Sequence, residues 1–240
     1  MTTLFISDLH LDAGHPEITQ QFLSLLANDA RNAEALYILG DLFESWVGDD
    51  AADTAQAAAI AGLKALTGSG VPCFVMHGNR DFLLGDRFCA RSGARLLPDP
   101  LIVTLYGEPV LVMHGDALCT DDAAYQRLRA TVRDSRWQGQ FLALSVAARR
   151  ALAGAARAGS QAHTAAAAYA ITDVHPASVA AALREAGVTT LLHGHTHRPG
   201  IHALTVDGRA CTRIVLGDWH ARGSVLRWNL TGPELISLPR

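Results

Sequence analysis

The chain has 240 residues, of which 49% are hydrophobic and 18% are charged. This composition is too apolar for a disordered protein and suits one large domain. The formal net charge of −3 does not indicate a nucleic-acid-binding protein. Because the four cysteines form no CxxC pair, we expect reduced cysteines of an intracellular protein rather than a disulfide framework. We expect neither a signal peptide nor a membrane span, since no apolar run approaches roughly 20 residues.

Five short apolar segments, each followed abruptly by Asp, Asn, His or Gly, are predicted to be β-strands. They run into SDLH (7–10), GD (40–41), HGNRD (77–81), HGD (114–116) and HGHTH (193–197). Apolar residues at helical spacing predict helices over 16–33 and 51–66. Continuous apolar strands indicate an α/β protein with strands buried on both faces, and the carboxyl ends of such strands are where active sites lie. The turn pairs within 203–239 predict antiparallel strands.

Residues 122–172 differ from the rest of the chain. They contain seven arginines and two aspartates, a net charge of +5 that leaves −8 for the remainder. The segment is rich in alanine and has no proline, so it is predicted to be helical. We therefore expect a core made of 1–121 and 173–240 with an inserted helical lid. One interpretation is a solvated helical hairpin, but the charge asymmetry and the apolar residues favour an anionic, apolar partner such as a lipid or a membrane surface.

Seven potential metal donors follow the predicted strands, and none is a cysteine. Alternate residues of an extended segment point the same way, so each of the two His-containing pairs, one in SDLH and one in GHTH, can face a single point. Oxygen and imidazole donors suit Mn²⁺, Fe²⁺ or Zn²⁺, and seven exceed what one ion needs. Two ions that share a bridging carboxylate fit better. The donors are Asp8, His10, Asp41, Asn79, His114, His195 and His197.

The motifs DxH (8–10), GD (40–41), GNRD (78–81), HGD (114–116) and GHTH (194–197), in this order, resemble those of the calcineurin-like metallophosphoesterases. The resemblance implies a two-sheet β-sandwich flanked by helices. It also implies two ions bridged by one aspartate. The implied ligands are Asp8, His10, Asp41 and His197 for one ion, and Asp41, Asn79, His114 and His195 for the other.

Arg80 occupies a position where many members of this family carry a histidine that assists the leaving group. Arginine stays protonated, so it cannot act as a general acid, but it can clamp phosphate oxygens and stabilise transition-state charge. A phosphate leaving group needs no proton donor, because its second pKa is about 6. Arg80 therefore favours cleavage of a diphosphate bond. The alternative is that His114 or His195 supplies the proton.

Longer segments, among them YILGDLFE, GNRDFLLG, MHGDALCTDDAAYQ and VLGDWH, resemble the family of bacterial UDP-2,3-diacylglucosamine diphosphatases nearly end to end. This resemblance implies water attack at the α-phosphorus of UDP-2,3-diacylglucosamine, which gives UMP and 2,3-diacylglucosamine 1-phosphate in lipid A biosynthesis. It implies two divalent ions, usually Mn²⁺, and a lid that holds the acyl chains. The implied catalytic residues are Asp41, Asn79, Arg80 and His195. The implied substrate contacts are Asn79, Arg80, Asp122, Ser160, Thr164 and His195.

One position departs from this closer pattern, because Ala167 stands where relatives commonly carry a lysine. Either Arg157 or His163 compensates, or the contacts to the headgroup differ. We expect a monomer that binds no nucleic acid and attaches peripherally, through the lid, to the cytoplasmic face of the inner membrane. Two other functions are a nucleotide or phosphoprotein phosphatase on the same scaffold, and a binding module without catalysis, which the complete donor set disfavours.

Several further polar or aromatic residues receive supporting roles. Asp81 and Asp116 are expected to orient loops rather than to bind metal. His193 is expected to be buried behind the two histidines that follow it. Trp46 and Trp137 are expected to pack in the core or to line an acyl pocket.

Overall fold

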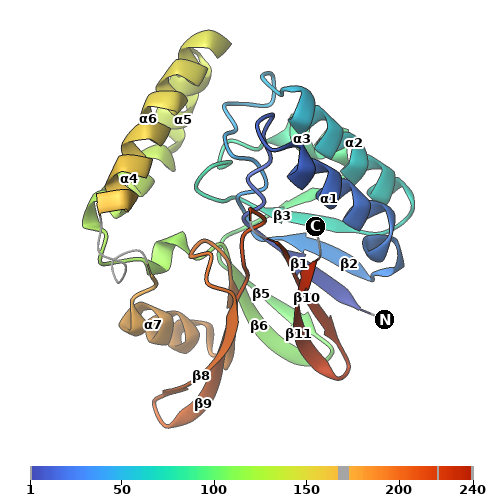
Figure 1. The fold of residues 1–240 in the computed structure, drawn as a ribbon. Coiled ribbons are helices and arrows are strands. Elements are labelled where there is room, and N and C mark those ends of the chain that lie inside the picture. The colour runs from blue at the N-terminus through green and yellow to red at the C-terminus, as the bar shows by residue number, and fades with distance from the viewer. Residues whose placement is uncertain (1, 167–172, 221, 239–240) are drawn as a thin grey trace.

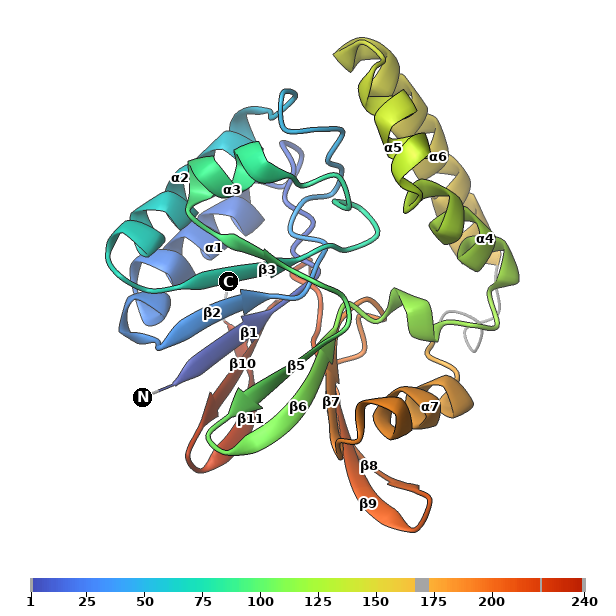
Figure 2. The ribbon, with the colours of Figure 1, turned by 180° about the vertical axis from the view of Figure 1, so that it is seen from behind.

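The computed structural model describes residues 2–166, 173–220 and 222–238, and in this part of the chain two β-sheets pack face to face between helices (Figures 1 and 2). The first sheet has six strands in the order β11 (Gly232–Leu238), β10 (Gly223–Asn229), β1 (Thr3–Ile6), β2 (Ala35–Ile38), β3 (Cys73–Met76) and β4 (Arg95–Leu97). The second has five, in the order β5 (Leu101–Leu105), β6 (Glu108–Met113), β7 (Thr190–His193), β9 (Arg209–Val215) and β8 (Gly200–Val206).

The helices of the described residues form two outer layers and one separate group (Figure 1). Those on the first sheet are α1 (Pro16–Ala27), α2 (Thr54–Gly68) and α3 (Asp86–Ser92), and α7 (Pro176–Ala186) lies on the second. The separate group, which we call the lid helices, comprises α4 (Ala123–Val132), α5 (Ser135–Leu142) and α6 (Val146–Ala166). Two short 3₁₀ helices are η1 (Asp29–Asn32) and η2 (Asp116–Leu118).

Each sheet contains a set of adjacent parallel strands, which in the first sheet extends to the edge strand β4. β1 to β4 run parallel in the first sheet, where antiparallel β10 borders them on one side. β6, β7 and β9 run parallel in the second sheet, where antiparallel β5 and β8 border them on either side. The five predicted apolar strands are β1, β2, β3, β6 and β7, so that prediction is confirmed. The predicted antiparallel tail forms two hairpins, β8–β9 and β10–β11, which belong to different sheets.

Strand β1 shows why continuous apolar runs mark these strands. Leu4 and Ile6 pack in a core with the side chains of α1, α2 and α3, whereas Phe5 packs in a second core between the sheets. Successive side chains of a strand point to opposite faces, so a strand with both faces covered must be apolar at every position. All four residues of β1 are buried.

The helix predicted over 51–66 begins three residues later than expected. Asp53 accepts a hydrogen bond from the backbone N–H of Gln56, and the Gln56 side chain accepts one from the backbone N–H of Asp53. This reciprocal cap ends the extended segment and starts α2 at Thr54. Just before this cap, Asp50 and Ala51 instead accept hydrogen bonds from Arg149 and Arg150 of the lid helices.

The lid helices stand beside the loops at the carboxyl ends of the central strands (Figures 1 and 2). The predicted helical character of 122–172 is confirmed as far as residue 166, and residues 167–172 lie outside the described part of the chain. Several lid arginines contact the core: Arg149 pairs with Asp50, and Arg129 with Asp116. Part of the positive charge of the segment therefore holds it against an acidic core. None of the helices in the described ranges has the length and apolar character that a membrane crossing requires.

Candidate metal centre

The loops that follow β1, β2, β3, β6 and β7 converge at one edge of the two sheets (Figure 1). Hydrogen bonds join these loops directly: the backbone N–H of Asp8 donates to the carbonyl of Gly40, and that of Gly194 to the carbonyl of His114. All seven predicted donors lie on these loops. The structure therefore brings together residues from positions 8 to 197.

Five of the seven donors have a left-handed backbone conformation. The φ angles are 55° at Asp8, 52° at His10, 52° at Asp41, 66° at His195 and 56° at His197. Among the described non-glycine residues, only two others, both in turns, have positive φ. Such conformations cost of order 1–3 kcal/mol each in residues with a side chain, and they concentrate at functional sites. The backbone strain thus marks the same loops that the donor pattern predicts.

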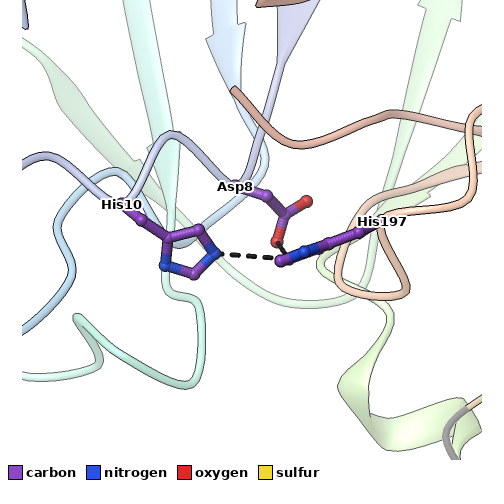
Figure 3. A group of neighbouring side chains, drawn as sticks. All are labelled: Asp8, His10 and His197. Atoms are coloured by element: carbon purple, nitrogen blue, oxygen red, sulfur yellow. Dashed lines mark hydrogen bonds and ion pairs between the residues drawn. The ribbon is translucent and has the colours of Figure 1, made fainter. Parts of the chain in front are cut away.

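One group of donors comprises Asp8, His10 and His197 (Figure 3). The Nε2 atoms of His10 and His197 lie 3.2 Å apart, and His197 Nε2 lies 3.4 Å from Asp8 Oδ1. This carboxylate oxygen is buried and accepts no well-formed hydrogen bond from the described residues. Two imidazole nitrogens and an unsatisfied carboxylate oxygen directed at one another fit a divalent cation between them.

The second group comprises Asn79, His114 and His195. Asn79 Oδ1 lies 2.9 Å from His114 Nε2 and 3.1 Å from His195 Nδ1. Asp41 lies between the two groups, with Oδ1 3.9 Å from His114 Nε2 and Oδ2 3.9 Å from His10 Nε2. Its carboxylate therefore presents one oxygen to each group, the arrangement that a bridging ligand needs.

The charges around His114 show how acidic this site is. Burial by itself lowers the pKa of His114, but the carboxylates of Asp41, Asp116 and Asp8 outweigh burial and raise this pKa to about 9. Burial dominates at His195 and lowers its pKa to about 4, so that imidazole is neutral at pH 7. Buried carboxylates next to a neutral imidazole favour the binding of a divalent cation at this site.

A sequence model of the calcineurin-like phosphoesterases matches residues 1–199. The chain belongs to the calcineurin-like phosphoesterase family. Over 247 aligned residues that span both chains completely, it is 56% identical to the UDP-2,3-diacylglucosamine hydrolase of Stenotrophomonas maltophilia (strain R551-3). It is 54% identical to the protein of the same name from Xanthomonas axonopodis pv. citri (strain 306), with 99% of each chain covered. An archaeal phosphodiesterase of solved structure shares the fold, with a TM-score of 0.50 and 13% identity over 99% of this chain and all of the other.

Two buried groups of this phosphoesterase shape the loop that carries Asp41. Asp81 is fully buried and accepts hydrogen bonds of 2.8 Å from the backbone N–H groups of both Leu42 and Gly78. Gly78 leaves room for Asp41, because a Cβ atom at that position would lie 2.0 Å from Asp41 Oδ1. The structure thus agrees with the prediction that Asp81 orients a loop.

Asp116 connects the centre of the phosphoesterase to α4. It accepts hydrogen bonds from Tyr125 Oη at 2.7 Å and from Arg129 Nε at 2.8 Å. The Tyr125 ring stacks on that of His195 with 5.9 Å between ring centroids. A lid residue therefore contacts a candidate metal ligand directly.

Sequence reasoning missed four residues of the site: Glu44, Tyr125, Asp218 and His220. Glu44 Oε2 lies 3.0 Å from His10 Nδ1, and Asp218 Oδ2 lies 3.4 Å from His197 Nδ1. His220 stacks on His10 with 5.8 Å between ring centroids. Asp218 had a signal in the sequence, because Gly217–Asp218 follows β9 as Gly40–Asp41 follows β2. Glu44 and Tyr125 had none, since their partners are distant in sequence or lie on another element.

The remaining predicted residues are placed as follows. His193 is fully buried, and Nδ1 lies 2.8 Å from the carbonyl oxygen of Gly194. Asp122 caps α4, where Oδ1 accepts a 2.9 Å hydrogen bond from the backbone N–H of Tyr125. Ser160 and Thr164 belong to the part of α6 whose side chains are not described, and Ala167 lies outside the described residues.

Two adjoining cavities open between the donors and the lid helices. The first, of about 590 Å³, is lined by the donors His10, Asp41, Asn79, His195 and His197 and also by Asp122. The second, of about 560 Å³, is mainly apolar, with walls formed by Trp46, Phe82, Leu128, Val132, Trp137 and Phe141. Both predicted tryptophans thus line the apolar cavity. Asn79, Arg80, Tyr125 and Arg157 line both cavities and mark their junction.

Proposed function

We propose that this phosphoesterase hydrolyses the diphosphate bond of UDP-2,3-diacylglucosamine in lipid A biosynthesis. Relatives that are more than 50% identical over their full length carry the name UDP-2,3-diacylglucosamine hydrolase. The observation that carries the proposal is the pair of joined cavities, one lined by metal donors and one by apolar side chains. A nucleotide-linked, doubly acylated sugar needs the first cavity for its diphosphate and the second for its acyl chains.

The proposed substrate fits the cavities in one orientation. The acyl chains occupy the apolar cavity between Trp46, Trp137 and Phe141, where each buried methylene contributes about 0.8 kcal/mol. The diphosphate then reaches the junction, where the donor Asn79 and the adjacent Arg80 line both cavities. Asp122, Ser160 and Thr164 are proposed to contact the glucosamine headgroup. In this assignment 122–172 is an acyl-binding lid, and 1–121 with 173–240 is the catalytic core.

We assign the donors to two divalent ions, with Mn²⁺ as the proposed metal. Asp8, His10, Asp41 and His197 would hold one ion, and Asp41, Asn79, His114 and His195 the other. Ions bound there would activate water and neutralise charge on the phosphate oxygens. The family and the grouping of the donors support divalent ions at this place.

The protein's own residues have separate parts in the proposed reaction. A water oxygen attacks the α-phosphorus, and the bond from that phosphorus to the bridging oxygen breaks. The products are UMP and 2,3-diacylglucosamine 1-phosphate. The Arg80 guanidinium clamps phosphate oxygens, and Asn79 and His195 stabilise the charge that develops on them. The leaving group is a phosphate, so it departs without a proton donor.

We also propose a monomer that attaches peripherally to the cytoplasmic face of the inner membrane through the lid. Large apolar side chains gather on the lid helices and the loops between them. Leu128, Leu142, Leu144 and Leu152 are between 41% and 52% exposed. Three of them, Leu128, Leu144 and Leu152, also line the apolar cavity, and they would contact the lipid phase from which the substrate is drawn.

Product analysis in ¹⁸O-labelled water tests the proposed reaction. Purified protein is incubated with Mn²⁺ and UDP-2,3-diacylglucosamine, and both products are analysed by mass spectrometry. We expect the label in UMP. Label in 2,3-diacylglucosamine 1-phosphate would contradict attack at the α-phosphorus. Hydrolysis of simple nucleotides or phosphopeptides with no turnover of the lipid would show a different phosphatase on this scaffold.

A further inference from the structure

Glu44 lies between a candidate metal ligand and the lid. One carboxylate oxygen, Oε2, lies 3.0 Å from His10 Nδ1, and the other forms an ion pair with Arg157 on α6. The side chains of His10, Glu44 and Arg157 are 5%, 19% and 29% exposed, so the chain of contacts is largely shielded from water. It joins the loops after β1 and β2 to the longest lid helix.

Glu44 lies on the side of the His10 ring that faces away from the other donors. His10 Nε2 points toward the donor group, 3.2 Å from His197 Nε2, while Nδ1 points toward Glu44. A carboxylate at Nδ1 keeps the proton on that nitrogen and leaves the lone pair of Nε2 for a metal ion. Such a partner also fixes the orientation of the imidazole ring.

Arg157 determines how firmly Glu44 is held. Glu44 is mostly buried beside an acidic centre, and burial of a carboxylate is costly unless a cation compensates it. Arg157 supplies this cation from α6. If α6 moves away, Glu44 loses an ion-pair partner, and its interaction with His10 weakens.

We infer that Glu44 is a positioning residue that couples docking of the lid to the affinity of the metal centre. The inference rests on the proposed function, because it takes His10 to be a metal ligand. Coupling between two events is reciprocal. Docking of α6 therefore strengthens metal binding, and metal binding holds α6 more firmly on the core.

The first test is Mn²⁺ binding to the metal-free full-length protein, measured by isothermal titration calorimetry with no substrate present. We expect Glu44→Gln to weaken the affinity by about 10- to 100-fold, the usual effect of removing a partner behind a metal-binding histidine. Arg157→Ala, which removes the ion-pair partner of Glu44, should weaken it by a smaller but measurable factor. Arg157→Lys keeps the charge and should restore most of the loss.

A matched control is Asp207→Asn, which breaks an ion pair at the other end of the second sheet. Asp207 pairs with Arg184 at 2.6 and 3.0 Å, and this variant should bind Mn²⁺ like the wild type. The second readout is hydrogen exchange of the α6 amides over 146–159, which Mn²⁺ should slow in the wild type but not in Glu44→Gln. The coupling would be overturned if Arg157→Ala left the Mn²⁺ affinity unchanged. It would also be overturned if Mn²⁺ did not slow hydrogen exchange of the α6 amides in the wild type. A wild-type protein that binds no Mn²⁺ would instead overturn the proposed metal centre, and the coupling with it.

Discussion

Gly78→Ala is the smallest change that should disable the centre. A Cβ atom at position 78 would lie 2.0 Å from Asp41 Oδ1 and 2.2 Å from the Asp41 backbone nitrogen, whereas ordinary contacts begin at 3.4 Å. Asp41 and residue 78 must therefore separate by about 1.4 Å, the difference between 3.4 and 2.0 Å. Asp41 is the residue proposed to serve both ions, so any shift there reaches both donor groups.

Neither Asp41 nor residue 78 can move away from the other without breaking a hydrogen bond. Asp41 Oδ1 accepts a 2.7 Å hydrogen bond from the backbone N–H of Arg80, and the backbone N–H of Gly78 donates one of 2.8 Å to Asp81. A misplacement of about 1 Å at a catalytic group costs on the order of 100-fold in rate. We therefore expect kcat/KM to fall by about 100-fold or more.

The assay is initial-rate hydrolysis of UDP-2,3-diacylglucosamine at saturating Mn²⁺, with circular dichroism and Tm measured on the same samples. Gly68→Ala is the matched control, because a Cβ atom at the end of α2 would meet nothing within 4 Å. That variant should retain full activity. A folded Gly78→Ala protein with kcat/KM within about threefold of the wild type would refute the steric reasoning.

Three further predictions concern the centre and the lid. Asp41→Ala should abolish turnover and lower the number of bound Mn²⁺ ions measured by metal analysis; retained turnover would exclude a shared carboxylate. Ala153→Trp should narrow the apolar cavity and raise KM for the acylated substrate, by about fourfold for each methylene excluded. The same variant should leave a small chromogenic phosphodiester unaffected, and equal losses on both would argue against an acyl site there. Chelation by EDTA should remove activity and Mn²⁺ should restore it; activity that survives exhaustive chelation would contradict metal dependence.

Local sequence patterns were sufficient to predict the central strands and the donors at their ends. A strand covered on both faces must be apolar throughout, so β1, β2, β3, β6 and β7 appear as uninterrupted apolar runs. Polar residues and glycines then follow at once, because the chain turns there into the site. Parallel strands carry these ends to the same edge of a sheet, which is why donors from positions 8 to 197 could be grouped before any distance was known.

Contacts between segments distant in the sequence could be found only in the tertiary structure. The pattern of 122–172 predicted helices and a positive charge, but not that Arg149 pairs with Asp50 or Arg157 with Glu44. The pattern of the tail predicted antiparallel strands, but not that they form two hairpins, β8–β9 and β10–β11, in different sheets.

The physical reason for this division is the range of the interactions. Burial on a strand and the turn that ends it depend on neighbouring residues, and they leave a periodic or punctuated pattern in the sequence. The partner of a charged or aromatic side chain depends instead on which loops the fold brings together. Sequence alone therefore identified the candidate donors of this phosphoesterase and predicted the edge of the sheets where they gather. Only the tertiary structure decided that Glu44 lies behind His10, that Tyr125 stacks on His195, and that the donor-lined and apolar cavities meet at Arg80.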